Sequence, residues 1–201
     1  MSPGPAGTGL VGIGVPDAAE AWQSIGCRVV DGAVDLANGS LLLGVTGLAV
    51  DGGFDTELEG IPIRSGLRRV AVAQPNGAVE LDHVVVLTSS IERTSAVVED
   101  RLGLPCRRLR ETDRVRQAFH RFADVEGARG CILEIVEDRR IPDGTAQLMG
   151  LVLVVDDLNG LTERLGPDVV SSPRPAVQAG RSIATVRRDV GLGTAVAMMS
   201  P

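Results

Sequence analysis

Residues 80–137, ELDHVVVLTSSIERTSAVVEDRLGLPCRRLRETDRVRQAFHRFADVEGARGCILEIVE, decide the fold of this chain. Val84 to Leu87 form an apolar run rich in β-branched residues, which predicts a buried strand. Ser89 or Ser90 can then cap a helix, and Gly103 is suited to its C-terminal cap. Three more strand-like runs follow, over residues 106–110, 117–122 and 131–137. The predicted order is therefore strand, helix and three strands, a βαβββ module.

Two polar residues stand out on the first and last strands of this module. His83 is one of only two histidines in the chain, and Glu134 lies inside the apolar run 131–136. Burying a carboxylate there costs several kcal/mol unless it is paired or protonated. We therefore expect a polar cavity or a partner at Glu134. A histidine beside a carboxylate can also transfer protons, with the carboxylate fixing the imidazole tautomer.

An ordered set of segments carries a resemblance to a known family. The segments are Leu81-Asp82-His83-Val84-Val85-Val86, Leu102-Gly103-Leu104, Arg116-Gln117-Ala118-Phe119 and Ile132-Leu133-Glu134-Ile135-Val136. As a set they resemble the glyoxalase-like proteins of the vicinal oxygen chelate superfamily, which also holds dioxygenases and bleomycin-resistance proteins. The resemblance implies an α+β fold whose paired βαβββ modules form a cupped mixed sheet. It also implies that His83 and Glu134 are ligands of a divalent metal such as Zn, Ni, Mn or Fe.

Residues 147–201 form a second, shorter module. A strand over 150–155, a helix over 158–165 and two closing strands repeat the earlier order. Aligning the two modules places Gly150 opposite His83 and Ala197 opposite Glu134. Neither glycine nor alanine has a side chain that can bind a metal, so two of the four ligands that the resemblance implies are missing. His120 is a candidate third ligand, and Gln178 supplies a further oxygen donor.

Residues 1–75 read as an additional degenerate N-terminal module. A strand over 10–15, a helix over 17–25 and short strand-like runs up to residue 45 indicate a βαββ order, and 67–73 is a further possible strand. A turn-forming cluster at 74–77 places a linker at 76–79, before modules at 80–140 and 147–201. The glycines of GTGLVG, residues 7–12, match a dinucleotide fingerprint, but no strand precedes them, so we do not expect dinucleotide binding.

Composition excludes several classes of function. A net charge of −6 with one Trp, three Phe and no Tyr argues against a nucleic-acid partner. The chain has no lysine, which excludes Schiff-base and P-loop lysine chemistry. Its three cysteines are widely spaced, which suits a reducing compartment, and no apolar run is long enough for a membrane span. We therefore expect a cytoplasmic protein without a membrane partner, and its sheet edges favour a homodimer.

The sequence thus predicts a cup, centred on His83 and Glu134, that binds a small organic metabolite. The further residues expected to bind the ligand are Gln117, Phe119, His120, Gln178 and Arg181. Three alternatives stay open: a metal-dependent lyase, isomerase or dioxygenase, a metal-free protein that binds or sequesters its ligand, and a purely structural or interaction module. A basic cluster favours a solvated surface, and a clamp for a carboxylate or phosphate stays open as the alternative. Its members are Arg107, Arg108, Arg110, Arg114 and Arg116.

Overall fold

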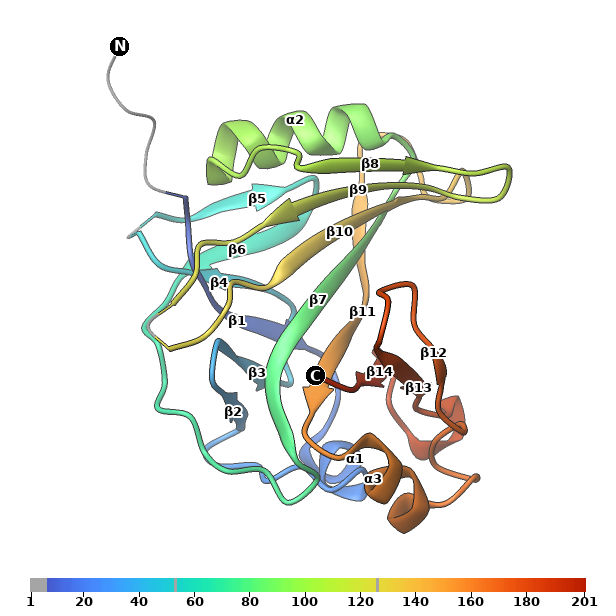
Figure 1. Ribbon diagram of the computed structural model, residues 1–201. Coiled ribbons are helices and arrows are strands. Elements are labelled where there is room, and N and C mark those ends of the chain that lie inside the picture. The colour runs from blue at the N-terminus through green and yellow to red at the C-terminus, as the bar shows by residue number, and fades with distance from the viewer. Residues whose placement is uncertain (1–6, 53, 126) are drawn as a thin grey trace.

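The computed structural model describes residues 7–52, 54–125 and 127–201, which fold into two mixed β-sheets with few helices (Figure 1). The expected α+β class is therefore confirmed. Within the described residues, the first sheet has the strand order β2-β3-β1-β4-β6-β5, and the second has the order β12-β13-β14-β11-β7-β10-β9-β8.

The larger sheet consists of two modules. The first contains β7 (Ala78–Thr88), α2 (Ile91–Leu102), β8 (Arg108–Glu111), β9 (Arg116–Arg121) and β10 (Ile132–Glu137). The second contains β11 (Ala146–Val155), α3 (Leu158–Leu165), β12 (Arg174–Pro175), β13 (Ser182–Thr185), a 3-10 turn (Arg188–Val190) and β14 (Ala195–Met199). The long strands β7 and β11 pair antiparallel and join the modules into one sheet within a single chain.

An approximate twofold axis relates the two modules. His83 lies seven residues before Ser90, the N-cap of α2, and Gly150 lies seven residues before Asp157, the N-cap of α3. In the parallel pairs, His83 faces Ile132 of β10 and Gly150 faces Ala195 of β14. The structure therefore supports the alignment of Gly150 with His83 and, two residues further along each closing strand, of Ala197 with Glu134.

The N-terminal sheet repeats this arrangement in a reduced form. Its elements are β1 (Leu10–Val15), α1 (Ala19–Ser24), β2 (Ala33–Leu36), β3 (Gly39–Leu43), β4 (Gly47–Val50), β5 (Thr56–Leu58) and β6 (Ile61–Ser65). Strand β1 is parallel to β3, β4 is parallel to β6, and β1 and β4 pair antiparallel. Residues 10–65 thus contain two small modules, where the sequence had indicated a βαββ unit followed by a segment without clear structure.

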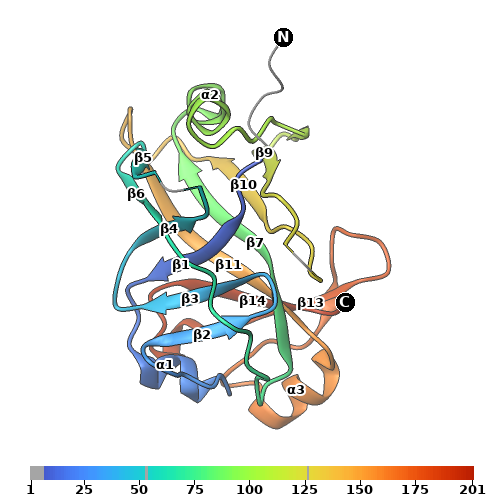
Figure 2. The ribbon, with the colours of Figure 1, turned by 90° about the vertical axis from the view of Figure 1, so that its left-hand side faces the viewer.

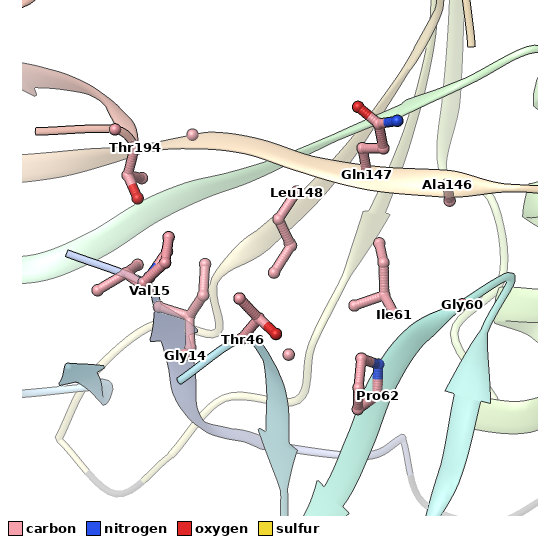
Figure 3. Close-up of a pocket in the computed structure, with 15 residues that line it drawn as sticks. Gly14, Val15, Thr46, Gly60, Ile61, Pro62, Ala146, Gln147, Leu148 and Thr194 are labelled. Carbon is pink, nitrogen blue, oxygen red and sulfur yellow. The ribbon is translucent and has the colours of Figure 1, made fainter. Parts of the chain in front are cut away.

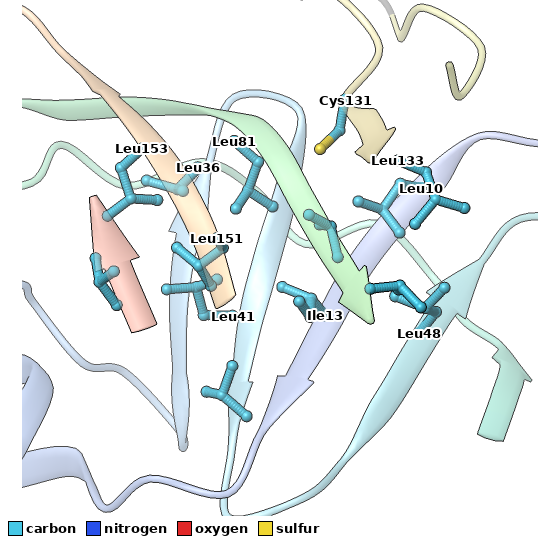
Figure 4. Packing of buried hydrophobic residues seen from close by; sticks show 14 of the residues in the cluster. Leu10, Ile13, Leu36, Leu41, Leu48, Leu81, Cys131, Leu133, Leu151 and Leu153 are labelled. Atoms are coloured by element: carbon cyan, nitrogen blue, oxygen red, sulfur yellow. The ribbon is translucent and has the colours of Figure 1, made fainter. Parts of the chain in front are cut away.

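The hydrophobic core lies between the two sheets (Figure 2). Figure 4 shows Leu41 and Leu48 of the N-terminal sheet facing Leu133 and Leu151 of the larger one, and all four side chains are at most 2% exposed. Helix α2 packs on β9 and β10, and α3 packs near β13. Both helices therefore lie on the same side of the larger sheet as the N-terminal sheet. This side of the larger sheet is covered, which leaves its other side open.

Helix α2 begins and ends where the sequence predicts. The Ser90 hydroxyl accepts a hydrogen bond from the Arg93 amide at 3.3 Å, and Gly103 adopts φ 64°, which favours glycine. Residues 67–73 were predicted as a possible strand, and this is wrong. They form a loop with Leu67 and Val70 exposed. Among the described residues, the one backbone hydrogen bond from this loop to a strand runs from the Val72 amide to the Asp35 carbonyl oxygen of β2 at 3.2 Å, which is not enough to form a strand pair. No described helix is long and apolar enough to cross a membrane.

Candidate active site in the cup of the larger sheet

The open side of the larger sheet holds a cavity of about 460 Å³ that both modules line. We call it the cup. Its outermost strands, β8 and β12, lie on the same side of Figure 1, with the sheet curving between them. The sequence-predicted residues that line it are His83, Gln117, Phe119, Glu134 and Gln178. The structure therefore brings together five of the residues that were singled out from the sequence.

A β-bulge in β7 shapes the base of the cup. Val152 of β11 lies opposite His83, but the next residue, Leu153, lies opposite Leu81, so Asp82 is an extra residue in the ladder. Such a bulge re-aims side chains that strict alternation would send to opposite faces. As a result, the Asp82 carboxylate contacts Nδ1 of the neighbouring His83 ring. Asp82 is a site residue that the sequence analysis did not single out.

The Asp82 carboxylate lies between the Arg181 guanidinium and the His83 ring and is ionised. Its Oδ1 accepts a hydrogen bond of 2.7 Å from Arg181, and its side chain is only 14% exposed. Burial raises the pKa of this carboxyl, but hydrogen bonds from His83 and Arg181 outweigh burial and lower the pKa to about 2. An ionised Asp82 favours the His83 tautomer that carries its proton on Nδ1. His83 lines the cup, and within the described part of the chain no hydrogen bond involves its Nε2, which is therefore available to a ligand.

Glu134 is fixed by a separate set of contacts on the neighbouring strands. Gln117 donates to the Glu134 carboxylate through Nε2, and Arg110 donates to the Gln117 side-chain oxygen at 3.0 Å. Phe119 lies between these groups and the histidine, with its ring in an edge-to-face arrangement with His83 at 6.5 Å and 79°. Glu134 is half-buried and has a polar partner, as its place in an apolar strand led us to expect.

Two of the sequence-predicted residues, His120 and Arg181, lie outside the cup. His120 is fully buried on the opposite face, where Nδ1 lies 2.7 Å from the Leu104 carbonyl oxygen and Nε2 lies 3.0 Å from the Ser95 hydroxyl. Burial lowers the pKa of His120, so the ring is neutral near pH 7. Arg181 borders a neighbouring cavity, where it binds Asp82 and the Ser200 carbonyl oxygen. We therefore assign Arg181 to positioning Asp82.

The donors in the cup do not match a catalytic divalent metal site. Such sites usually take three protein ligands from imidazole, thiolate and carboxylate groups. Here only His83 and Glu134 are of these types, because His120 lies on the other face and Ala197 carries no donor. A metal-binding side chain does not fit at position 150 either, since a Cβ at Gly150 would lie 2.2 Å from the Ala195 carbonyl oxygen. No group of three or more His, Cys, Asp or Glu suited to a metal occurs among the described residues.

A second cavity, of about 270 Å³, lies between the N-terminal sheet and β11 (Figure 3). Figure 3 shows Val15, Ile61, Pro62 and Leu148 turned toward it, with Thr46 and Thr194 as its hydroxyl groups. None of the described residues that line this cavity has an ionisable side chain. The cup differs from this cavity, since His83 and Glu134 line it.

No protein-family model matches this chain, and no curated protein matches it. Among solved structures, it is similar to the methylmalonyl-CoA epimerase of Streptomyces coelicolor, in complex with 2-nitronate-propionyl-CoA. The TM-score is 0.49 and the identity 15%, over 61% of this chain and 97% of that one. It is also similar to the methylmalonyl-CoA epimerase of Mycobacterium tuberculosis, with a TM-score of 0.48 and 18% identity over 62% and 89% of the two chains. A hypothetical protein of Bacillus halodurans has a TM-score of 0.46 and 15% identity over 61% and 94%.

Proposed function

We propose that the cup binds a small organic molecule and that His83 exchanges a proton with it. The observation that carries this proposal is the cavity of about 460 Å³ with a carboxylate-oriented imidazole at its base. A ligand there would meet apolar surface from Phe119, Val152 and Met199. Small-molecule sites commonly have this composition, with apolar walls and a few fixed polar groups.

The proposed proton transfer depends on which nitrogen of the His83 ring carries the proton. Because Asp82 faces Nδ1, the lone pair of Nε2 can accept a proton from the bound molecule, and the electron pair of the broken bond stays on that molecule. The imidazolium that forms is stabilised by Asp82, and returning the proton restores the neutral ring. Glu134 is held by Gln117 and supplies a second proton acceptor on the neighbouring strand.

Binding can be tested with N-phenyl-1-naphthylamine, a neutral probe that fluoresces in apolar cavities. We expect saturable binding to the wild-type protein and loss of binding in Val152→Trp, whose indole would fill the cup. Val70→Trp is the matched control, because Val70 is 86% exposed on the loop before β7. Equal binding by both variants would place the probe elsewhere and refute the cup as the site.

Proton transfer can be tested by exchange in D₂O. With 2-oxobutyrate as the probe, proton NMR would follow loss of the C3 proton signal. We expect exchange catalysed by the wild-type protein to fall at least tenfold in His83→Gln. If the wild-type protein binds the naphthylamine probe but catalyses no exchange with this or other 2-oxo acids, the protein binds its ligand without this chemistry, as the metal-free sequestering alternative predicts.

The metal-dependent alternative and the expected homodimer have direct tests. Metal content of the untagged protein, measured beside His83→Ala, would support a metal-dependent lyase, isomerase or dioxygenase if a stoichiometric divalent ion were lost in the variant. Such a result would replace the metal-free mechanism. Light scattering after size exclusion gives the mass in solution, and a mass near 42 kDa, twice that of the 21.0 kDa chain, would support the dimer.

A further inference from the structure

Three arginines surround the cup from its two outermost strands. Arg108 and Arg110 project from β8, where they lie opposite Phe119 and Gln117 of β9, and Arg174 projects from β12 of the other module. All three line the cup. Arg108 and Arg174 are exposed, and Arg110 is half-buried. Of the basic cluster expected from the sequence, only Arg108 and Arg110 line the cup. Arg174, which is not part of that cluster, joins them from a distant segment.

These three guanidinium groups have no carboxylate partner among the described residues, unlike the two arginines of the neighbouring strand β9. Arg116 binds Glu92 and Glu137, and Arg121 binds Asp124. By contrast, no acidic group lies within 4 Å of the guanidinium nitrogens of the three cup arginines, as far as the described residues go. Arg110 donates only to the neutral amide of Gln117, and the guanidinium carbon of Arg108 lies 6.0 Å from the centre of the Phe119 ring.

The charge of the cup is therefore unbalanced. Glu134 is the one carboxylate among the described residues that line it, against three guanidinium groups. This sign is opposite to the net charge of −6 for the whole chain. Guanidinium groups left without carboxylates at the rim of a cavity are suited to bind a carboxylate or phosphate through paired N–H donors.

We infer that the ligand of the cup is anionic: a carboxylate or phosphate group binds Arg108, Arg110 and Arg174 at the rim, and an apolar body lies deeper, against Phe119 and Met199. This inference rests on the proposed function, since it names the class of molecule that the same cup takes. It also gives the ligand an orientation, because the anionic end is at the outer strands and the other end approaches His83 on β7.

A matched pair of probes separates this inference from the proposed function. 8-Anilinonaphthalene-1-sulfonate has the aromatic body of N-phenyl-1-naphthylamine plus one sulfonate group, which stands in for the natural anion. We expect the sulfonate probe to bind the wild-type protein about tenfold more tightly than the neutral probe, since hydrogen bonds to charged groups contribute at about this level. The difference should shrink as salt rises from 20 to 500 mM, because exposed charges are screened.

The decisive variant is Arg108→Gln/Arg174→Gln. We expect it to abolish the preference for the sulfonate probe, measured as the ratio of its affinity to that of the neutral probe. Arg139→Gln is the control, because Arg139 is exposed and does not line the cup. Competition by acetate and by inorganic phosphate at equal ionic strength then shows whether a carboxylate or a phosphate is preferred.

Each outcome is decisive. If the neutral probe binds but the sulfonate probe shows no preference, or keeps its preference in the double variant, the anion site is refuted and the proposed function stands. If neither probe binds the folded protein, the cup does not accept such ligands, and the inference fails together with the proposed function.

Discussion

Replacing Asp82 by asparagine should make the stability of the protein less dependent on pH in the acid range. The Asp82 carboxyl has a pKa of about 2 in the folded protein, compared with an ordinary value of 3.8. At roughly 1.4 kcal/mol per pKa unit, this lowering contributes about 2 kcal/mol to the free energy of unfolding. Because the folded pKa is the lower of the two, the contribution is complete above about pH 5 and is lost as the pH falls toward 2.

The assay is denaturation by urea at pH 7, 5, 3 and 2. Trp22 is the one tryptophan of the chain and is fully buried, so its fluorescence reports unfolding, and circular dichroism provides a second probe. We expect Asp82→Asn to be about 2 kcal/mol less stable than wild type at pH 7, with the difference shrinking toward pH 2. The control is Asp113→Asn, at an exposed residue without a hydrogen-bond partner among the described residues.

Two results would refute this reasoning. A loss of stability in Asp82→Asn that is the same at pH 7 and pH 2 would show that the carboxylate charge is not what Arg181 and His83 stabilise. A variant as stable as wild type at pH 7 would show that the bulge of β7 does not hold Asp82 against these partners. Either result would also remove the basis for a fixed His83 tautomer.

Three further predictions concern positions outside this contact. Gly150→Ala should lower the free energy of unfolding by about 1–3 kcal/mol in urea titrations, because its methyl group would overlap the Ala195 carbonyl; an unchanged stability would refute the close approach. His120→Gln should cost about 1–3 kcal/mol through its buried hydrogen bonds yet leave probe binding in the cup unchanged, and a loss of binding would refute its structural role. A thiol reagent should label Cys106 before unfolding and Cys27 only after it, because burial raises the pKa of Cys27 to about 12; rapid labelling of Cys27 would contradict this.

Local sequence signals were sufficient for the larger sheet. The apolar run of β7, the Ser90 cap and Gly103 each specify one local conformation, and the structure confirms them. The N-terminal half was harder, because strands β4–β6 are only three to five residues long, too short for a clear periodic pattern. The apolar residues of the loop over 67–73 were misleading, since composition alone does not show whether a run finds a pairing strand.

The site could be predicted only in part, because the direction of its side chains depends on strand pairing as well as on local sequence. Residues of β9 and β10 follow strict alternation, so Phe119 and Glu134 could be placed on a common face once the strand order was known. Alternation puts His120 on the other face, but only the packing of α2 shows which face is covered. Asp82 was missed because alternation assigns it away from His83, and a bulge depends on the pairing with β11.

The cup is asymmetric, because its histidine and its carboxylate both belong to the first module. The approximate twofold axis passes through the pair Val84 and Leu151, so a symmetric sheet would offer two equivalent sites. Only the first module brings a histidine and a carboxylate to the cup, since Gly150 and Ala197 stand at the equivalent positions. The second module instead contributes apolar wall, Gln178 and Arg174. A ligand should therefore lie off the axis, toward β9 and β10, and substitutions at Glu134 should weaken its binding or conversion more than substitutions of similar size at Ala197.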